Sequence, residues 1–435
     1  MTMQRNIKIY ITLFSVSLLL FGSCKKDYGD LNGETIEDLT KNASQAQLNN
    51  LVSGTESGMR NSLSFYLDDV SIIGRETYRF SNSEPRYVLD LLGANGATLQ
   101  GANFYITFPW ASRYRVVKNC NTLIQAANNS TLISATQKAG YTGFARTIKA
   151  YQLLLNLNLT YDNGIRVNVA DPAHLGPFVN YTDGLAAITA LLDSAKTDLS
   201  TASISFQLAG FTGLDDAVGL TKFNRALAAR VSLYQSNWQT ALDDANASFL
   251  NLSGSFNTGV YHVFGTGSGD QLNPVFIPQN QNGEIRVAHP SYKADILSGD
   301  DRINKTSIRG SLASLSGLSS DRDVWLYTTS TAPVGIIRNE ELILIYAEAN
   351  IQLNHFTEAV NALNTIRNGH GLGNYGGAVN QAALIAELLY ERRYSLFLEG
   401  HRWIDLRRYN LLNTLPIDRT GDEVWTKFPL PVTEQ

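Results

Sequence analysis

Apolar side chains recur at spacings of three and four residues near the C-terminus of the chain. They predict an amphipathic helix over residues 340–353, because this spacing places them on one helical face. After a short polar break, a second stripe predicts a helix over residues 356–366. A third helix is expected over residues 382–398 and should end at Gly400, since glycine commonly follows a helix C-terminus. This part of the chain is therefore predicted to be a set of packed helices.

One hairpin pattern occurs twice. The run ARVSLYQSNWQTAL starts at Ala229, and the run AEANIQLNHFTEAV starts at Ala347. In each run, small residues are followed by a short polar turn, an aromatic residue (Trp238 or Phe356) and an alanine three positions later. This pattern is typical of tetratricopeptide-type hairpins, and the copies lie much farther apart than the ~34 residues of a tandem array. We therefore expect hairpins set into one larger fold; generic hairpins with coincidental alanines are the alternative.

Helical periodicity also marks most of the remaining chain. Further helices are expected over residues 44–65, 104–128, 136–159 and 183–199, and the hairpin that contains the Ala229 run is expected over residues 221–250. Two irregular insertions interrupt them, at about 66–103 and 252–337, and the second has β-like runs at 260–264, 275–277 and 324–327. An unstructured segment of that length is rare in a compact domain unless it is functional. The predicted fold is mainly α, a single domain over residues 33–435 whose insertions carry short β segments.

The first two dozen residues have the pattern of a targeting signal. Arg5 and Lys8 precede an apolar run over residues 9–21, which is shorter than the ~20 residues that a membrane-spanning helix needs. Small residues then precede Cys24, as a lipoprotein signal peptidase requires. We predict a lipoprotein signal peptide over residues 1–23, a lipid on Cys24 and a flexible tether over residues 24–32. An ordinary signal peptide with an incidental cysteine is the alternative.

Composition and motifs exclude several functions. The 435 residues contain 35 Lys and Arg against 39 Asp and Glu, with no basic stripe, so nucleic acid is not an expected ligand. The six histidines form no HExxH motif or Cys/His cluster, and the glycine-rich stretches lie outside any βαβ unit. The chain has no GxSxG nucleophile elbow, and its adjacent aspartate pairs do not indicate carboxylates facing each other across a substrate. We predict no catalytic residue, no metal site and no cofactor.

The run YERRYSLFLEGHRWIDLRR, which begins at Tyr390, is the most specific motif. Together with Cys24, the two hairpins and the closing FPLP run that begins at Phe428, it resembles the SusD/RagB family of Bacteroidetes. The resemblance implies a mostly helical fold with four tetratricopeptide-like hairpins. It also implies an outer-membrane, lipid-anchored, surface-exposed nutrient-binding protein that sits on a SusC-like TonB-dependent transporter barrel. The cargo of such proteins is usually an oligosaccharide, and in some members it is a peptide.

The charges of this run also have a direct physical interpretation. Acidic and basic residues are interleaved with apolar ones, and such charges usually pair because an unpaired buried charge is expensive. We expect an ion-paired clamp that holds the last helix, rather than catalysis by His401 and Trp403. The charges concerned are Glu391, Arg392, Glu399, Arg402, Asp405 and Arg407.

Sugar-binding members of the family use aromatic rings on surface loops, which stack on the apolar face of a pyranose. Candidates of this kind, with polar partners for the hydroxyls, lie in both insertions. They are Tyr78, Tyr87, Tyr292, Trp325, Tyr327, Asp69 and Arg302. The alternative is that these rings pack the loops on the helices. The leading hypothesis is glycan binding and delivery to the transporter; peptide capture, a glycoside hydrolase and a protein-binding scaffold are the alternatives.

Overall fold

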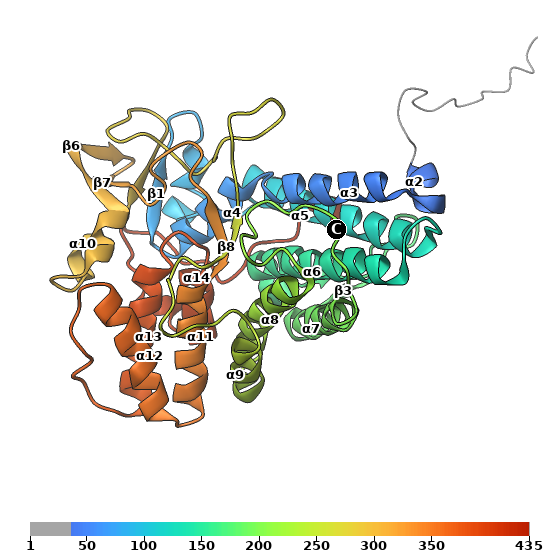
Figure 1. Cartoon of the computed structure of the whole chain (residues 1–435). Coiled ribbons are helices and arrows are strands. Elements are labelled where there is room, and N and C mark those ends of the chain that lie inside the picture. The colour runs from blue at the N-terminus through green and yellow to red at the C-terminus, as the bar shows by residue number, and fades with distance from the viewer. Residues whose placement is uncertain (1–35, 435) are drawn as a thin grey trace, which may run out of the picture.

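The computed structural model describes residues 36–434, so the predicted signal peptide, Cys24 and the tether lie outside the described residues. Long helices form one half of the molecule, where α3, α5 and α6 lie side by side (Figure 1). The helices of the first half of the chain are α2 (Ile36–Asn42), α3 (Gln45–Met59), α4 (Leu63–Ile73), α5 (Phe104–Asn129), α6 (Ala135–Thr160) and α7 (Tyr181–Leu199). Capping boxes at Ser44 and Ser134 satisfy the first amide groups of α3 and α6. No helix within this part of the chain is both long and apolar enough to span a bilayer.

The predicted helix hairpins are confirmed. Trp238 and Phe356 begin the second helix of each hairpin, and the alanines three positions later are fully buried. The elements are α8 (Ala217–Tyr234), α9 (Trp238–Asn246), α11 (Asn339–Gln352), α12 (Phe356–Gly369), α13 (Gln381–Ser395) and α14 (Arg402–Arg408). A large hydrophobic core joins most of the helices, and a smaller one lies among α11, α12 and α13. The mainly α fold class is therefore confirmed.

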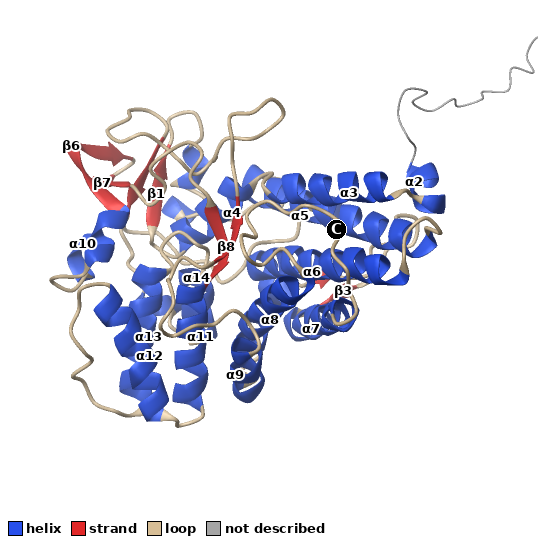
Figure 2. Cartoon of the chain, viewed as in Figure 1, coloured by secondary structure: helices blue, strands red, loops and turns tan. Residues whose placement is uncertain are grey.

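The two insertions meet in one antiparallel sheet, with strand order β1-β5-β7-β6 (Figure 2). In its register, Tyr78 of β1 lies opposite Val287 of β5. The strands are β1 (Thr77–Phe80), β5 (Ile285–Ala288), β6 (Thr306–Leu315) and β7 (Leu318–Val324), and the short helix α10 (Pro290–Asp295) follows β5. Two small ribbons pair β2 (Ile165–Arg166) with β3 (Phe178–Val179) and β4 (Gly259–His262) with β8 (Val334–Arg338).

Several predicted boundaries are wrong. The helix expected over residues 44–65 breaks after Met59, because Ser62 adopts a left-handed backbone (φ 55°), and α4 then continues into the first insertion. Of the β-like runs, 260–264 largely coincides with β4, whereas 275–277 forms no strand and β7 ends where 324–327 was expected to begin. The third C-terminal helix ends at Ser395 rather than near Gly400. Gly400 (φ 86°) instead turns the chain into α14.

Candidate functional site

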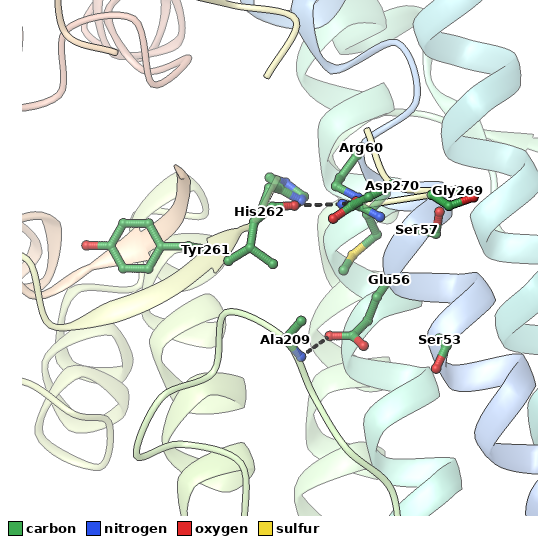
Figure 3. A pocket seen from close by; sticks show the side chains of 12 residues that line it. Ser53, Glu56, Ser57, Arg60, Ala209, Tyr261, His262, Gly269 and Asp270 are labelled. Carbon is green, nitrogen blue, oxygen red and sulfur yellow. Dashed lines mark hydrogen bonds and ion pairs between the residues drawn. The ribbon is translucent and has the colours of Figure 1, made fainter. Parts of the chain in front are cut away.

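An open cavity of about 410 Å³ lies between α3, β4 and the loop that follows β4 (Figure 3). The helix contributes Ser53, Glu56 and Ser57, whose side chains lie along one side because they are three and four residues apart. The opposite wall comes from β4 and from the loop over residues 264–271. The volume falls within the ~300–1,000 Å³ of small-molecule sites.

Glu56 is the carboxyl group that α3 contributes to this cavity. Its Oε1 accepts a hydrogen bond from the main-chain N–H of Ala209, at 2.9 Å (Figure 3). Burial raises the pKa of Glu56 to about 7, and the opposing effects of the Ala209 bond and of Arg60 are smaller. Glu56 therefore changes charge near neutral pH, and it can either accept or donate a hydrogen bond there.

Arg60 connects the end of α3 to the loop. Its Nη1 donates to the carbonyl oxygen of Val263 at 2.7 Å and pairs with Asp270 at 2.5 Å, and its guanidinium carbon lies 5.9 Å from the ring centroid of Phe264. Gln271 donates from Nε2 to Asn61 Oδ1 at 3.2 Å. These contacts hold the loop over residues 264–271 against the cavity. They also place the guanidinium group of Arg60 near the carboxyl groups of Asp270 and Glu56.

The strand side of the cavity is uncharged. His262 is buried, and burial, with help from Arg113 and Arg60, lowers its pKa to about 3, so the imidazole is neutral. Tyr261 points away from the other labelled side chains, and its hydroxyl donates to the carbonyl oxygen of Asn257 (Figure 3). The charged chemistry of the cavity therefore comes from Glu56, Arg60 and Asp270.

Known proteins share this architecture. Residues 306–428, which include the run that begins at Tyr390, match the model of the SusD family. The structure of NanU from B. fragilis has a TM-score of 0.69 at 15% sequence identity, covering 93% of this chain and 96% of that one. Surface glycan-binding protein A from Bacteroides thetaiotaomicron, in complex with laminarihexaose, has a TM-score of 0.69 at 13% identity, covering 90% of this chain and 97% of that one. A SusD superfamily protein from Bacteroides vulgatus has a TM-score of 0.66 at 16% identity, covering 87% and 90%. No curated protein matches the sequence.

The resemblance to the SusD family is confirmed.

Within this SusD-like fold, most of the predicted ligand-contacting residues are buried. Tyr292 donates to the carbonyl oxygen of Arg302 at 2.8 Å and packs against Tyr394 and Phe397. Arg302 is itself held by Asp300 and Glu391, each at 2.7 Å. Both side chains therefore hold the sheet-bearing insertion on the C-terminal helices.

The predicted residues of the first insertion are also enclosed. Tyr78 stacks on Phe80, Tyr87 packs edge-on against Phe104, and both tyrosines are buried. Tyr327 is buried as well, with a hydroxyl that has no partner within residues 36–434. Asp69 is fully buried, and burial, with the neighbouring Asp68, raises its pKa well above the usual range. For these residues the burial favours the packing alternative, although their contact with a ligand stays a prediction.

Trp325 is the exception among the predicted rings. It is partly exposed and lies 6.3 Å, centroid to centroid, from the ring of Phe276, which is also partly exposed. The main-chain N–H of Trp325 donates to the carbonyl oxygen of Lys305 at 2.8 Å, which fixes the residue just past the end of β7. The Trp325–Phe276 pair can therefore still contact a ligand. Phe276 was not among the predicted residues.

The residues of the Glu56 cavity were not predicted from the sequence. Glu56 and Arg60 lie on a helix whose pattern is unremarkable, and Asp270 lies in a glycine-rich loop about 210 residues away along the chain. The one local signal is the run of small residues around Glu56, SGTESG, which leaves room beside the helix.

The ion-paired clamp is confirmed for four of the predicted charges. We use the name C-terminal clamp for the pairs Arg392–Asp405 (2.7 Å), Arg302–Glu391 (2.7 Å) and Arg338–Glu399 (2.6 Å). The prediction is wrong for Arg402 and Arg407, which form no ion pair with any carboxylate among residues 36–434 and donate to main-chain carbonyl oxygens instead.

His401 and Trp403, the two residues of this run that could have suggested catalysis, are both buried. His401 is buried, and burial lowers its pKa to about 4. Trp403 donates from its indole to the carbonyl oxygen of Trp425 at 2.7 Å. Residues 36–434 also hold no group of three or more His, Cys, Asp or Glu side chains arranged to bind a metal ion.

Proposed function

We propose that this SusD-like protein binds an oligosaccharide or polysaccharide at the Glu56 cavity and acts by binding rather than by catalysis. The observation that carries the proposal is the open, charged cavity on a fold shared with a surface glycan-binding protein bound to laminarihexaose. Sugar hydroxyls both donate and accept hydrogen bonds. Glu56 and Asp270 offer acceptors, Arg60 offers donors, and the serine hydroxyls of α3 offer both.

The Trp325–Phe276 pair is the second part of this proposal. A partly exposed indole can lie on the C–H face of a pyranose while polar groups elsewhere bind the hydroxyls. Such contacts give weak affinity for each sugar unit, and a longer chain gains affinity by touching both places. We therefore expect binding to increase with the length of the glycan.

We further propose the cellular setting implied by the family. The signal peptide over residues 1–23 is removed, lipid on Cys24 anchors the single domain to the outer membrane through the tether, and the protein delivers cargo to a SusC-like TonB-dependent transporter barrel. One acyl chain gives only marginal anchoring, so several chains on Cys24 are expected. Metabolic labelling with a fatty acid, lost in Cys24→Ala, tests the anchor. Copurification of a barrel with the tagged full-length chain tests the partner.

Peptide capture is the second candidate, and a specific observation favours it. The Glu56 cavity has charged side chains of both signs, Glu56 and Arg60 on the helix side and Asp270 on the loop side, as expected for a site that recognises peptide termini or charged side chains. A glycoside hydrolase is less well supported, because Asp270 is already paired with Arg60 at 2.5 Å.

The test uses native gels cast with plant, fungal and host polysaccharides and the purified full-length chain in detergent. We expect one polysaccharide to retard the protein, and Glu56→Gln and Trp325→Ala to weaken the retardation. Glu358→Gln, an exposed change on α12 that removes the same charge, is the matched control, and its retardation relative to a gel without polysaccharide should equal that of the parent chain. Retardation with shortening of the glycan would indicate a hydrolase. No retardation across the panel would contradict glycan binding and move the search to peptides copurified with the transporter.

A further inference from the structure

A second cavity, of about 430 Å³, lies between the end of α6 and the segment that follows α14. Three distant parts of the chain meet there: the turn after α6, the end of α14 with the residues after it, and the C-terminal segment. The lining residues are Tyr161, Arg407, Asn410, Leu412, Asn413 and Thr426. The lining thus combines one guanidinium group with amides and hydroxyls, all of which can donate hydrogen bonds.

Arg407 differs from the arginine beside it. Arg408 pairs with Glu348 at 2.7 Å and with Asp405 at 2.9 Å. Arg407 is also buried, with 7% of its surface exposed, yet no carboxylate within residues 36–434 forms an ion pair with it. Buried charges are almost always paired, because an uncompensated charge in the interior is costly. The position of Arg407 on the cavity wall therefore needs an explanation.

Neutral groups hold the Arg407 side chain in place. Its Nη1 donates to the carbonyl oxygen of Thr426 and its Nη2 to that of Asn158, both at 2.9 Å. The guanidinium carbon lies 4.3 Å from the ring centroid of Tyr161 and 4.6 Å from that of Trp403. These contacts fix the orientation of the group, but none of them supplies a negative charge. The cavity wall therefore carries a positioned, uncompensated cation.

Other charges near the cavity do not cancel this cation. Lys427 and Asp162, which adjoin lining residues in the sequence, pair with each other at 2.8 Å, so their charges offset. The C-terminal end of α14 contributes at most a partial negative charge, which the full charge of Arg407 exceeds. An anion that entered the cavity would meet a net positive wall with amide and hydroxyl donors around it.

We propose that this cavity binds the oxyanion of an acidic saccharide. Arg407 holds the carboxylate of a uronic acid or a sulfate ester, since its planar fork matches both groups. Asn410, Asn413 and Thr426 bind hydroxyls of the same sugar ring. The inference rests on the proposed glycan-binding function and deepens it, because it makes the ligand an acidic glycan and adds a site separate from the Glu56 cavity.

Titration calorimetry of the full-length chain in detergent tests this site. The probes are a galacturonic acid trisaccharide and its fully methyl-esterified form, which keeps the rings and loses the charge. Galactose 6-sulfate and unsulfated galactose form a second pair. We expect the acidic trisaccharide to bind about tenfold or more tightly than its ester, a difference typical of one charge-assisted contact. Tighter binding of the sulfate ester than of galactose would assign the site to sulfated sugars instead of uronates.

Two variants locate the binding. Arg407→Gln should remove the preference for the charged probe. Because Arg407 is buried, Asn413→Asp provides a second variant at an exposed lining position, and its negative charge should weaken binding of the acid about tenfold while the fold is kept. Asn361→Asp, an exposed change on α12, is the matched control and should bind like the parent chain.

The outcomes separate this inference from the proposed function. Equal affinity for the acid, its ester and the sulfated sugar, with neutral glycans still lost in Glu56→Gln, would overturn the Arg407 site and leave the Glu56 cavity in place. Binding of the acid that is lost in Asn413→Asp but unaffected by Glu56→Gln would support the Arg407 site even if no neutral glycan bound. An acid preference that survives both Arg407→Gln and Asn413→Asp would also overturn the inference.

Discussion

The C-terminal clamp and the Glu56 cavity contain the same types of charged residue, but their carboxyl groups differ in how completely they are paired. In the clamp, Asp405 accepts from Arg392 at 2.7 Å and lies 2.9 Å from Arg408, and all three side chains are largely enclosed. In the cavity, Glu56 accepts one main-chain N–H, and Arg60 is the cation that acts to lower its pKa. Burial raises the pKa of both carboxyls, but the two guanidinium groups outweigh it at Asp405, whose pKa falls to about 2, whereas that of Glu56 rises to about 7.

The difference separates charges that stabilise the fold from charges left for a ligand. A clamp charge has its partners within the chain, so its contribution appears in the free energy of unfolding. The carboxyl of Glu56 forms no ion pair within residues 36–434. Its ionised form therefore costs stability and can bind a ligand. Arg407 is a charge left for a ligand, although it lies in the same sequence run as the clamp residues Arg392 and Asp405.

Asp405→Ala should cost about 3–5 kcal/mol of unfolding free energy, because it leaves Arg392 buried without its carboxylate. Denaturant titration measures this cost. The matched control is Asp162→Ala, which removes an exposed pair with Lys427 and should cost less than about 1 kcal/mol. Similar costs for the two variants would contradict the comparison.

Glu56→Gln should change how stability depends on pH. The folded pKa of about 7 lies above the ordinary value of 4.5, so the folded state holds this proton more tightly than the unfolded state. The resulting stabilisation is complete below pH 4.5 and is lost as the pH rises through 7. The variant, which cannot ionise, should therefore become more stable than the parent chain above pH 7, by on the order of 1 kcal/mol after allowance for solvent screening.

Unfolding temperatures of both chains between pH 4 and pH 8.5 measure this effect, with Glu358→Gln as the control. The opposite pH dependence is expected from Asp405, whose pKa is lower in the folded state than its ordinary value of 3.8. Its contribution to stability is complete above pH 3.8 and is lost as the pH falls toward 2. If the unfolding temperature of Glu56→Gln equalled that of the parent chain at every pH, the proposed difference between the Glu56 cavity and the C-terminal clamp would be contradicted.

The sequence predicted the periodic parts of the fold and little of the candidate site. The hairpins that begin at Trp238 and Phe356 were found because a buried helical face requires a regular stripe. The sheet was missed because β1 and β5 pair across about two hundred residues, and neither strand alternates clearly enough to be recognised alone. Tyr78 and Tyr292 have polar neighbours in the sequence, but in the fold Arg79 pairs with Glu284 and Lys293 with Asp321, while both rings are buried.

Arg60→Ala should have the smallest effect on global stability, about 1 kcal/mol or less, because its partner Asp270 remains solvent-accessible once released. Its main effect should be local. Without the bonds to Val263 and Asp270, the loop over residues 264–271 keeps only the Gln271 contacts among its hydrogen bonds to the end of α3, and its amide hydrogens should exchange faster. Hydrogen exchange measured by mass spectrometry tests this, with peptides from α11 as the internal reference. Faster exchange across α11 as well would show that Arg60 stabilises the whole fold, as the clamp arginines do, and the cavity would then differ from the clamp only in its exposure.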